Sequence, residues 1–456
     1  PTMLQHDMEA YRARWSGFGW HAIVVDGHDI GALVAAFGEA ARTKGRPTVL
    51  LAKTFKGRGI SFIENHPDWH GKPLKKGEET QKALDELARQ LKPSSIQPQI
   101  SLPNAAKAAP ATKGTMAPAP YKLGDPVATR EAFGAALLAL GEANSLVVAL
   151  DADVKNSTYS DKFGKRFPDR FLENFIAEQN MLGAAAGIAA CGKIPFVATF
   201  AAFFTRAYDF IRMAAISQSN MKLVGTHVGV SIGEDGPSQM GLEDLAMMST
   251  QPGVTVLYPS DGLSMYRLME SAAAHKGMVY LRAGRPKTPV IYGADETFRI
   301  GGSKVLRQSA ADQLTIVAAG VTLFEALKAH DQLKAAGIAT RVVDLYSIVP
   351  VDQATLLDCA RATGGRFLTV EDHYAHGGIG DAGCAVHEVA DEPWFLSGRN
   401  VEGIMDDHHL SRAVLASADT DGRHFQRGSH FGGELGRYHF HQHHTGTGSL
   451  QRQRLG

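Results

Sequence analysis

The sequence predicts an α/β protein built from consecutive doubly wound domains with mainly parallel sheets. Short apolar runs of strand length alternate with longer segments of helical periodicity along most of the chain. A stretch rich in Pro and Ala, without periodicity, interrupts this alternation at 94–121 and is typical of a linker. The length of 456 residues favours two or three domains over one hydrophobic core.

Residues 1–93, before the linker, begin with helical and strand-like segments in alternation. The order is an amphipathic helix, an apolar strand, a helix and a second strand, at 7–16, 20–25, 29–44 and 48–53. This order is typical of a parallel βαβ unit. Because so few residues precede the linker, we expect only the last part of a doubly wound domain here.

After the linker, we expect a second domain at 122–293 and a third at 294–391. Their predicted strands are short, apolar and bounded by turn residues, at 146–150, 195–199, 223–228, 255–258 and 279–282, then at 314–319, 339–345 and 367–371. Periodic order fades near residue 390. The histidines of the segment 392–456 have irregular spacing, so we expect a disordered tail rather than a metal site.

Composition excludes several classes of partner. Lys and Arg number 47, and so do Asp and Glu, so neither nucleic acid nor an anionic membrane surface is expected as the main partner. No apolar run approaches the roughly 20 residues of a membrane span. The three cysteines, Cys191, Cys359 and Cys384, are scattered, which predicts buried thiols in a reducing compartment, the cytoplasm. The N-terminus has no targeting pattern, and a start at Pro1 suggests a chain cut from something longer.

Three dense clusters lie between residues 175 and 239. The first carries Glu178 beside amides at a strand-to-helix junction, the second is aromatic and contains Phe200 and Phe203, and the third is a Gly-rich turn with His227, Asp235 and Gln239. A flat ring with a basic nitrogen needs a carboxylate and a stacking aromatic, whereas a hydroxylated substrate needs His and Asp. The alternatives are a helix-terminal Glu, core packing of the two Phe, a buried strand-end His and an Asp that only makes a turn.

In this order, the clusters closely resemble the pyrimidine-binding domain of transketolases, which are thiamine-diphosphate enzymes. The resemblance implies that Glu178 holds the pyrimidine nitrogen and favours the imino tautomer, in which the cofactor acts as its own base. It implies that Phe200 and Phe203 stack on the pyrimidine and that Gln239 touches the cofactor. It also implies that His227 and Asp235 bind the oxygens of a sugar, with His227 near the reacting carbon.

Other motifs extend the resemblance to both sides. Arg130, Ser157 and Arg285 resemble the family's clamp for the phosphate of a sugar phosphate, although surface salt bridges are the alternative for each Arg. Lys56 and His70 resemble cofactor contacts at the end of the diphosphate-binding domain, and His70 also resembles a proton-transfer group. A basic Gly-rich loop is otherwise a solvated turn. The segments 370–373 and 377–380 resemble the C-terminal domain, with a structural, dimer-supporting role.

One motif of the family is missing. Transketolases hold a divalent metal through Gly-Asp-Gly and a later Asn, and no Gly-Asp-Gly occurs here, so Mg²⁺ is an expected cofactor without ligands in this chain. The resemblance implies a cytoplasmic homodimer of the pentose phosphate pathway. It would transfer a two-carbon ketol unit from a ketose phosphate, such as xylulose 5-phosphate, to an aldose phosphate, such as ribose 5-phosphate. The missing motif favours the alternative, a non-catalytic fragment or subunit that keeps the fold and the dimer surface.

Overall fold

The computed structural model describes residues 3–69, 71–91, 111–374 and 376–383, and the backbone of residues 412–418 and 425–429. The chain divides into two compact units, Pro1–Ala106 and Lys107–Gly456. Each unit is described by itself.

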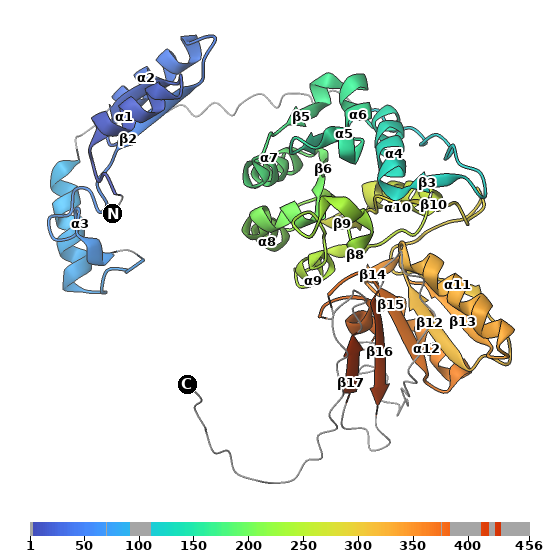
Figure 1. The fold of residues 1–456 in the computed structure, drawn as a ribbon. Coiled ribbons are helices and arrows are strands. Elements are labelled where there is room, and N and C mark those ends of the chain that lie inside the picture. Colours follow the sequence, from blue (N-terminus) through green and yellow to red (C-terminus); the bar gives the residue numbers. More distant parts are fainter. Residues whose placement is uncertain are drawn as a thin grey trace, which may run out of the picture. The chain divides into compact units, whose positions relative to one another are not determined.

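The N-terminal unit contains a parallel βαβ unit followed by a helix (Figure 1). Its elements are α1 Met8–Gly17, β1 His21–Asp26, α2 Ile30–Arg42, β2 Thr48–Lys53 and α3 Glu78–Gln90. Strands β1 and β2 pair in parallel. The side chains of Asp7 and Asp29 accept hydrogen bonds from the first turns of α1 and α2, each at 3.0 Å, which satisfies backbone donors that a helix leaves unpaired. The predicted βαβ order is therefore confirmed.

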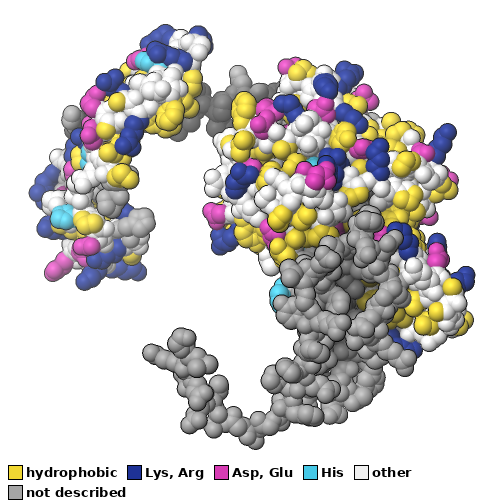
Figure 2. All heavy atoms as spheres, in the orientation of Figure 1, with side chains coloured by type: hydrophobic (Ala, Val, Ile, Leu, Met, Phe, Trp, Pro, Cys, Tyr) yellow, Lys and Arg dark blue, Asp and Glu magenta, His cyan; other side chains and the backbone are white. Residues whose placement is uncertain are grey.

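Large apolar side chains lie on the surface of this unit. Phe18, Ile30, Val34 and Phe37 have exposed fractions of 82%, 72%, 66% and 64%, and Figure 2 shows hydrophobic side chains along one side of the unit. Parallel sheets normally have both faces covered, and large exposed apolar patches mark interaction sites. The surface is thus suited to packing against further polypeptide.

A seven-stranded sheet forms the centre of the larger unit, in the order β14-β8-β9-β7-β6-β4-β5. All neighbours pair in parallel except β14 with β8. The strands are β4 Val147–Asp151, β5 Phe171–Glu173, β6 Ile194–Phe200, β7 Lys222–Thr226, β8 Thr255–Leu257, β9 Val279–Arg282 and β14 Ser347–Val349. A separate pair of antiparallel strands is formed by β3 Pro126–Ala128, which precedes β4 in the chain, and β10 Lys287–Pro289, which follows β9.

Helices cover both faces of this sheet (Figure 1). The apolar residues of β4 alternate, so that Val147 and Ala149 join one core and Val148 and Leu150 join the other. The first core contains residues of α4 Thr129–Ala143, α6 Asp161–Arg166 and α10 Gly262–Ala274. The second contains residues of α7 Glu178–Ala190, α8 Tyr208–Ile216 and α9 Asp244–Ser249. A short helix, α5 Lys155–Thr158, follows β4.

A second sheet, in the order β11-β13-β12-β15-β16-β17, forms the C-terminal domain. Its elements are β11 Lys304–Arg307, β12 Leu314–Ala318, α11 Thr322–Ala335, β13 Thr340–Asp344, α12 Gln353–Thr363, β15 Phe367–Glu371, β16 Arg412–Ala418 and β17 Phe425–Ser429. Val317 and Leu356 of this domain share one core cluster with Val197 and Leu223 of the other sheet. The two domains therefore form one packed body, and the α/β class with mainly parallel sheets is confirmed.

Two local expectations differ from the structure. Part of the expected disordered tail forms β16 and β17, because β15 offers backbone groups with which β16 pairs in antiparallel fashion. Of the cysteines expected to be buried, Cys359 is buried but Cys191 is exposed, since it lies just past the end of α7. Cys384 lies outside the described residues. Among the helices described, none is long and apolar enough to span a membrane.

Candidate active site at the carboxyl edge of the parallel sheet

The expected substrate and pyrimidine residues gather at one edge of the seven-stranded sheet. Phe200 ends β6, His227 directly follows β7, and Arg285 follows β9. Because parallel strands end at the same edge, these side chains approach one another although they are far apart in the sequence. Arg130, in the first turn of α4, and Glu178, the first residue of α7, belong to helices that begin near this edge.

Arg130, Ser157 and His227 are in direct contact. Nη1 of Arg130 donates to the backbone carbonyl of Ser157 at 2.9 Å and lies 3.3 Å from Nε2 of His227. Since a guanidinium can only donate, Nε2 is the acceptor. Nδ1 of His227 then carries the proton and donates to Oγ1 of Thr226 at 3.0 Å. The contacts thus select one neutral tautomer of His227.

Arg285 and Asp235 form the other side of this cluster. Nη1 of Arg285 lies 3.2 Å from Oδ2 of Asp235 and donates to the carbonyl of Ile232 at 2.5 Å, and its Nη2 pairs with Glu234 at 3.0 Å. Asp235 ends the short 3₁₀ helix η4, Val230–Asp235. The turn expected from the glycines is therefore partly helical, and it carries Asp235 to Arg285.

His227 is held neutral by its surroundings. Its exposed fraction is 2%, and burial, then the charges of Arg130 and Arg285, lower its pKa to about 3. Burial disfavours an ionised imidazole, and two nearby cations do the same. His227 can therefore exchange hydrogen bonds at neutral pH without carrying charge.

One polar atom of the cluster has no partner within the described residues. Nε of Arg130 is buried and makes no hydrogen bond there, and burial lowers the pKa of this guanidinium. Buried polar groups without partners are rare in folded proteins. Nε is closed to solvent, so an anion would have to contact the Nη atoms of Arg130 and Arg285, two guanidinium groups of the kind that bind phosphate.

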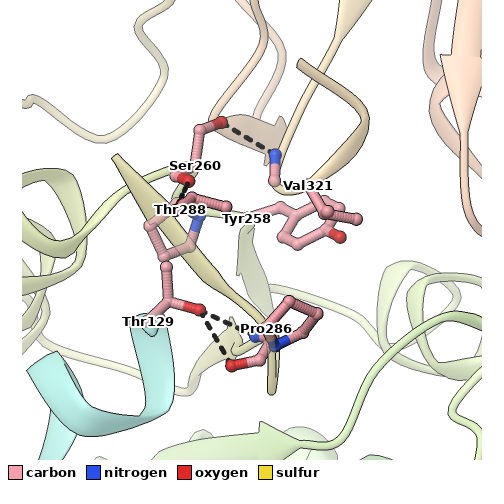
Figure 3. A pocket seen from close by; sticks show the side chains of 9 residues that line it. Thr129, Tyr258, Ser260, Pro286, Thr288 and Val321 are labelled. Atoms are coloured by element: carbon pink, nitrogen blue, oxygen red, sulfur yellow. Dashed lines mark hydrogen bonds between the residues drawn. The ribbon is translucent and has the colours of Figure 1, made fainter. Parts of the chain in front are cut away.

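Hydrogen bonds also link the segments that carry Arg130 and Arg285. Thr129 Oγ1 accepts a hydrogen bond from the amide of Gly284 at 2.7 Å, and the amide of Arg130 donates to the carbonyl of Gly284 at 3.3 Å. Thr129 and Gly284 line a small pocket together with Tyr258, Ser260 and Val321 (Figure 3). These contacts hold the backbone of Arg130 close to the segment that carries Arg285.

An aromatic wall adjoins His227. The rings of Phe200 and Phe203 stack with centroids 5.0 Å apart, and the ring of Phe200 stacks on His227 at 3.7 Å. Phe203 belongs to a 3₁₀ helix, η3 Ala201–Ala207. Both Phe residues are only partly buried, so their rings retain surface on which a ligand could stack.

Glu178 lies 3% exposed at the start of α7, where its carboxylate pairs with Arg206 at 3.0 Å. The guanidinium of Arg206 also lies over the ring of Phe203, 4.8 Å from its centroid. Glu178 and Phe203 are thus joined through one planar cation. Sequence reasoning missed Arg206, although its place three residues after Phe203 was a usable signal.

Three expected residues remain, Gln239, Lys56 and His70. Gln239 is half-buried on the segment that follows η4. Lys56 is exposed in the N-terminal unit, and His70 lies outside the described residues. No group of three or more potential metal ligands occurs in the part of the chain that the structure describes.

Comparisons with known proteins agree with this architecture. The family model for the thiamine diphosphate binding domain of transketolase matches residues 3–105, that for the pyrimidine binding domain matches residues 125–290, and that for the C-terminal domain matches residues 303–393. Transketolase-like protein 2 of Mus musculus is 52% identical over 399 residues, and transketolase of Homo sapiens is 51% identical over 392 residues.

These alignments cover most of this chain but only part of each relative. They include 86% and 84% of the chain, and 62% and 61% of the mouse and human proteins. Among solved structures, one titled "Split gene transketolase, inactive beta4 tetramer" matches with a TM-score of 0.54 and 39% identity, covering 59% of this chain and 87% of that one. The fold, the ordered domain matches and these identities show that the chain belongs to the transketolase family.

Proposed function

We propose that this chain carries the pyrimidine-side half of a transketolase active site, in a cytoplasmic homodimer that uses thiamine diphosphate and Mg²⁺. The reaction would move a two-carbon ketol unit from a ketose phosphate, such as xylulose 5-phosphate, to an aldose phosphate, such as ribose 5-phosphate, as in the pentose phosphate pathway. The observation that carries this proposal is the meeting of a buried carboxylate, an aromatic wall and an Arg–His–Arg cluster at one sheet edge.

The residues present fit the pyrimidine of the cofactor. Glu178 would hold a ring nitrogen from its buried position, Phe200 and Phe203 would stack on the ring, and Gln239 would contact it. When bound, thiamine diphosphate supplies a nucleophilic ring carbon and its own amino base. Glu178 contributes by retaining a proton at the ring nitrogen, and the aromatic wall contributes by excluding water. For the ring nitrogen to reach Glu178, the side chain of Arg206 would have to move away from the carboxylate or bind it together with the ring.

The Arg–His–Arg cluster fits a sugar phosphate. Arg130 and Arg285 offer two guanidinium groups, and Ser157 lies beside Arg130. Nε2 of His227 is an acceptor, so it would receive a hydrogen bond from a sugar hydroxyl in place of the one from Arg130. Asp235 would accept from another hydroxyl and thereby select its stereochemistry. Lys56 and His70 stay predicted contacts on the diphosphate side, with His70 a predicted proton-transfer group.

A reconstitution experiment tests the proposal. The chain is mixed with a separately expressed N-terminal transketolase half that carries Gly-Asp-Gly, and ketol transfer from xylulose 5-phosphate to ribose 5-phosphate is measured. We expect transfer by the mixture and a dimeric chain that alone binds thiamine diphosphate poorly and turns over negligibly. A divalent metal contributes several kcal/mol to binding of the diphosphate. Exposed basic side chains contribute less than that. Transfer with pyruvate as the only accepted donor would refute the proposed substrates.

A second candidate is a non-catalytic subunit that acts by association. It is favoured by the similarity to a structure titled as an inactive tetramer. Calorimetry with thiamine diphosphate and Mg²⁺, on the chain alone and after it is mixed with the N-terminal half, separates the two candidates. Micromolar binding by the chain alone, or ketol transfer after reconstitution, would exclude the non-catalytic role.

A further inference from the structure

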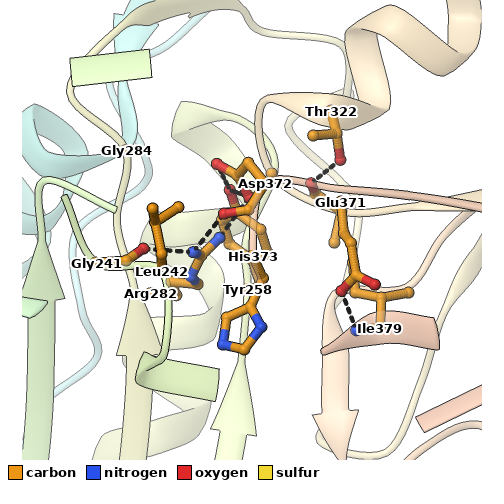
Figure 4. A network of polar contacts seen from close by, with 12 residues as sticks. Gly241, Leu242, Tyr258, Arg282, Gly284, Thr322, Glu371, Asp372, His373 and Ile379 are labelled. Carbon is orange, nitrogen blue, oxygen red and sulfur yellow. Dashed lines mark hydrogen bonds and ion pairs between the residues drawn. The ribbon is translucent and has the colours of Figure 1, made fainter. Parts of the chain in front are cut away.

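A buried ion network joins the two domains of the larger unit. Arg282, at the end of β9, has an exposed fraction of 0%, and it pairs with Asp244 at 2.8 Å and with Asp372 at 2.6 Å (Figure 4). Asp244 begins α9, whereas Asp372 follows β15 in the C-terminal domain. One cation is thus shared between carboxylates of two domains.

The two carboxylates are fully engaged. The hydroxyl of Tyr258 donates to both oxygens of Asp372, at 3.0 and 3.1 Å, and that of Tyr280 donates to Asp244 at 2.6 Å. A buried network whose members are all satisfied is rigid, and removing one member leaves an uncompensated charge. Its geometry is therefore tightly determined.

The network reaches the segment that carries His227. Nη2 of Arg282 donates to the carbonyl of Gly241 at 3.0 Å. The amide of Gly241 in turn donates to the carbonyl of His227 at 3.2 Å, and the carbonyl of Gly241 also accepts from the amide of Gly229 at 2.8 Å. Arg282 thus holds Gly241, and Gly241 holds both His227 and Gly229.

Asp372 also contacts this segment directly. A Cβ placed on Gly229 would lie 1.8 Å from Oδ2 of Asp372, so the carboxylate occupies the space that a side chain there would need. His227 and Gly229 both have positive φ values, 58° and 70°. A non-glycine residue at such a φ persists only where its surroundings hold it. Arg282, through Gly241, and Asp372, against Gly229, form part of those surroundings.

We propose that Asp372, acting with Arg282, is a positioning residue for His227, so that the C-terminal domain shapes the substrate site. This role goes beyond the structural, dimer-supporting one expected for the segment 370–373. The expected effect of Asp372 on the substrate rests on the function proposed above for His227. The placement of His227 by Asp372 does not depend on that function.

The test compares Asp372→Asn with a matched control, Asp312→Asn, each in the full chain. Asp312 is a buried carboxylate of the same domain that pairs with Arg341 at 3.2 Å. The titration of the His227 imidazole is followed by NMR, with His227→Gln assigning the signal. Reconstituted enzyme then gives kcat and KM for xylulose 5-phosphate.

For Asp372→Asn we expect the His227 pKa to move upward, because a loosened segment admits water. We expect kcat to fall on the order of 10- to 100-fold, the scale for a misplaced substrate-binding group. KM should change less, because Arg130 and Arg285 lie outside the network. Asp312→Asn should lower thermal stability and leave the titration and kcat unchanged.

Three outcomes would overturn the proposal: an unchanged His227 titration in folded Asp372→Asn, an unchanged kcat, or equal losses in both variants. If Asp372→Asn does not fold, Tyr258→Phe replaces it, since that change removes the hydroxyl that donates to the Asp372 carboxylate and keeps the ion pairs. Absence of ketol transfer by the unmodified enzyme would refute the proposed function alone, and the titration would still decide this inference.

Discussion

The neutral state of His227 leads to a quantitative prediction about stability. The perturbation is His227→Gln, which keeps an amide near Arg130 and removes the titrating group. In the folded protein, burial and the cations Arg130 and Arg285 lower the pKa of His227 from 6.5 to about 3. In the unfolded chain the imidazole keeps its ordinary pKa, about 6.5.

The sign and size of the effect follow from linkage. Between these two pKa values the unfolded chain binds a proton that the folded protein does not, so lowering the pH favours unfolding. The contribution of His227 is complete above pH 6.5 and is lost as the pH falls toward 3. One pKa unit corresponds to about 1.4 kcal/mol, so roughly 2 kcal/mol disappears between pH 6.5 and 5, and about 5 kcal/mol in full.

The assay is urea unfolding of the unmodified chain and of His227→Gln at pH 5, 6, 7 and 8. Between pH 7 and 5 the unmodified chain should lose about 2 kcal/mol more unfolding free energy than the variant. Comparison with the variant removes the opposite contributions of Asp151 and Glu371, whose pKa values burial raises to about 6 and about 7. Parallel pH curves, or an imidazole pKa of 6 or higher by NMR, would refute the reasoning.

Two further predictions concern other buried charged groups. Glu178→Gln should lower ketol transfer by reconstituted enzyme on the order of 10² to 10⁴-fold, the range for a positioned proton-transfer group; a folded variant with more than half of the native rate would remove Glu178 from the mechanism. Lys222 is fully buried, and burial lowers its pKa to about 7. The folded protein therefore releases this proton before the unfolded chain does, and stability should rise from pH 7 toward 10.5. Lys222→Met should remove that rise in thermal unfolding at pH 7 and 9, and equal rises in both proteins would contradict it.

Local patterns in the sequence determined the fold class and the family. Apolar runs of strand length set the strands because a strand between two helical layers is buried on both faces, as β4 and β6 are. The clusters around Glu178, Phe200 and His227 were recognisable because each is contiguous, with its chemistry within a few neighbouring residues. In the structure, Phe200, His227 and Arg285 meet because each lies at or just after the end of a parallel strand, and parallel strands end at one edge.

Only the tertiary structure decided which charges pair and which segment supports the site. Arg206 meets Glu178 across 28 residues, and Arg282 meets Asp372 across 90, so no helical or strand periodicity relates the partners. The same holds for β16, whose pairing with β15 depends on an available sheet edge rather than on its own polarity. These contacts arise when separate elements pack on shared cores, and burial then makes each charge dependent on its partner. The local sequence determines the helices and strands. The packing of the two domains determines which charged groups pair in the buried network near His227, because burial makes each charge depend on its partner.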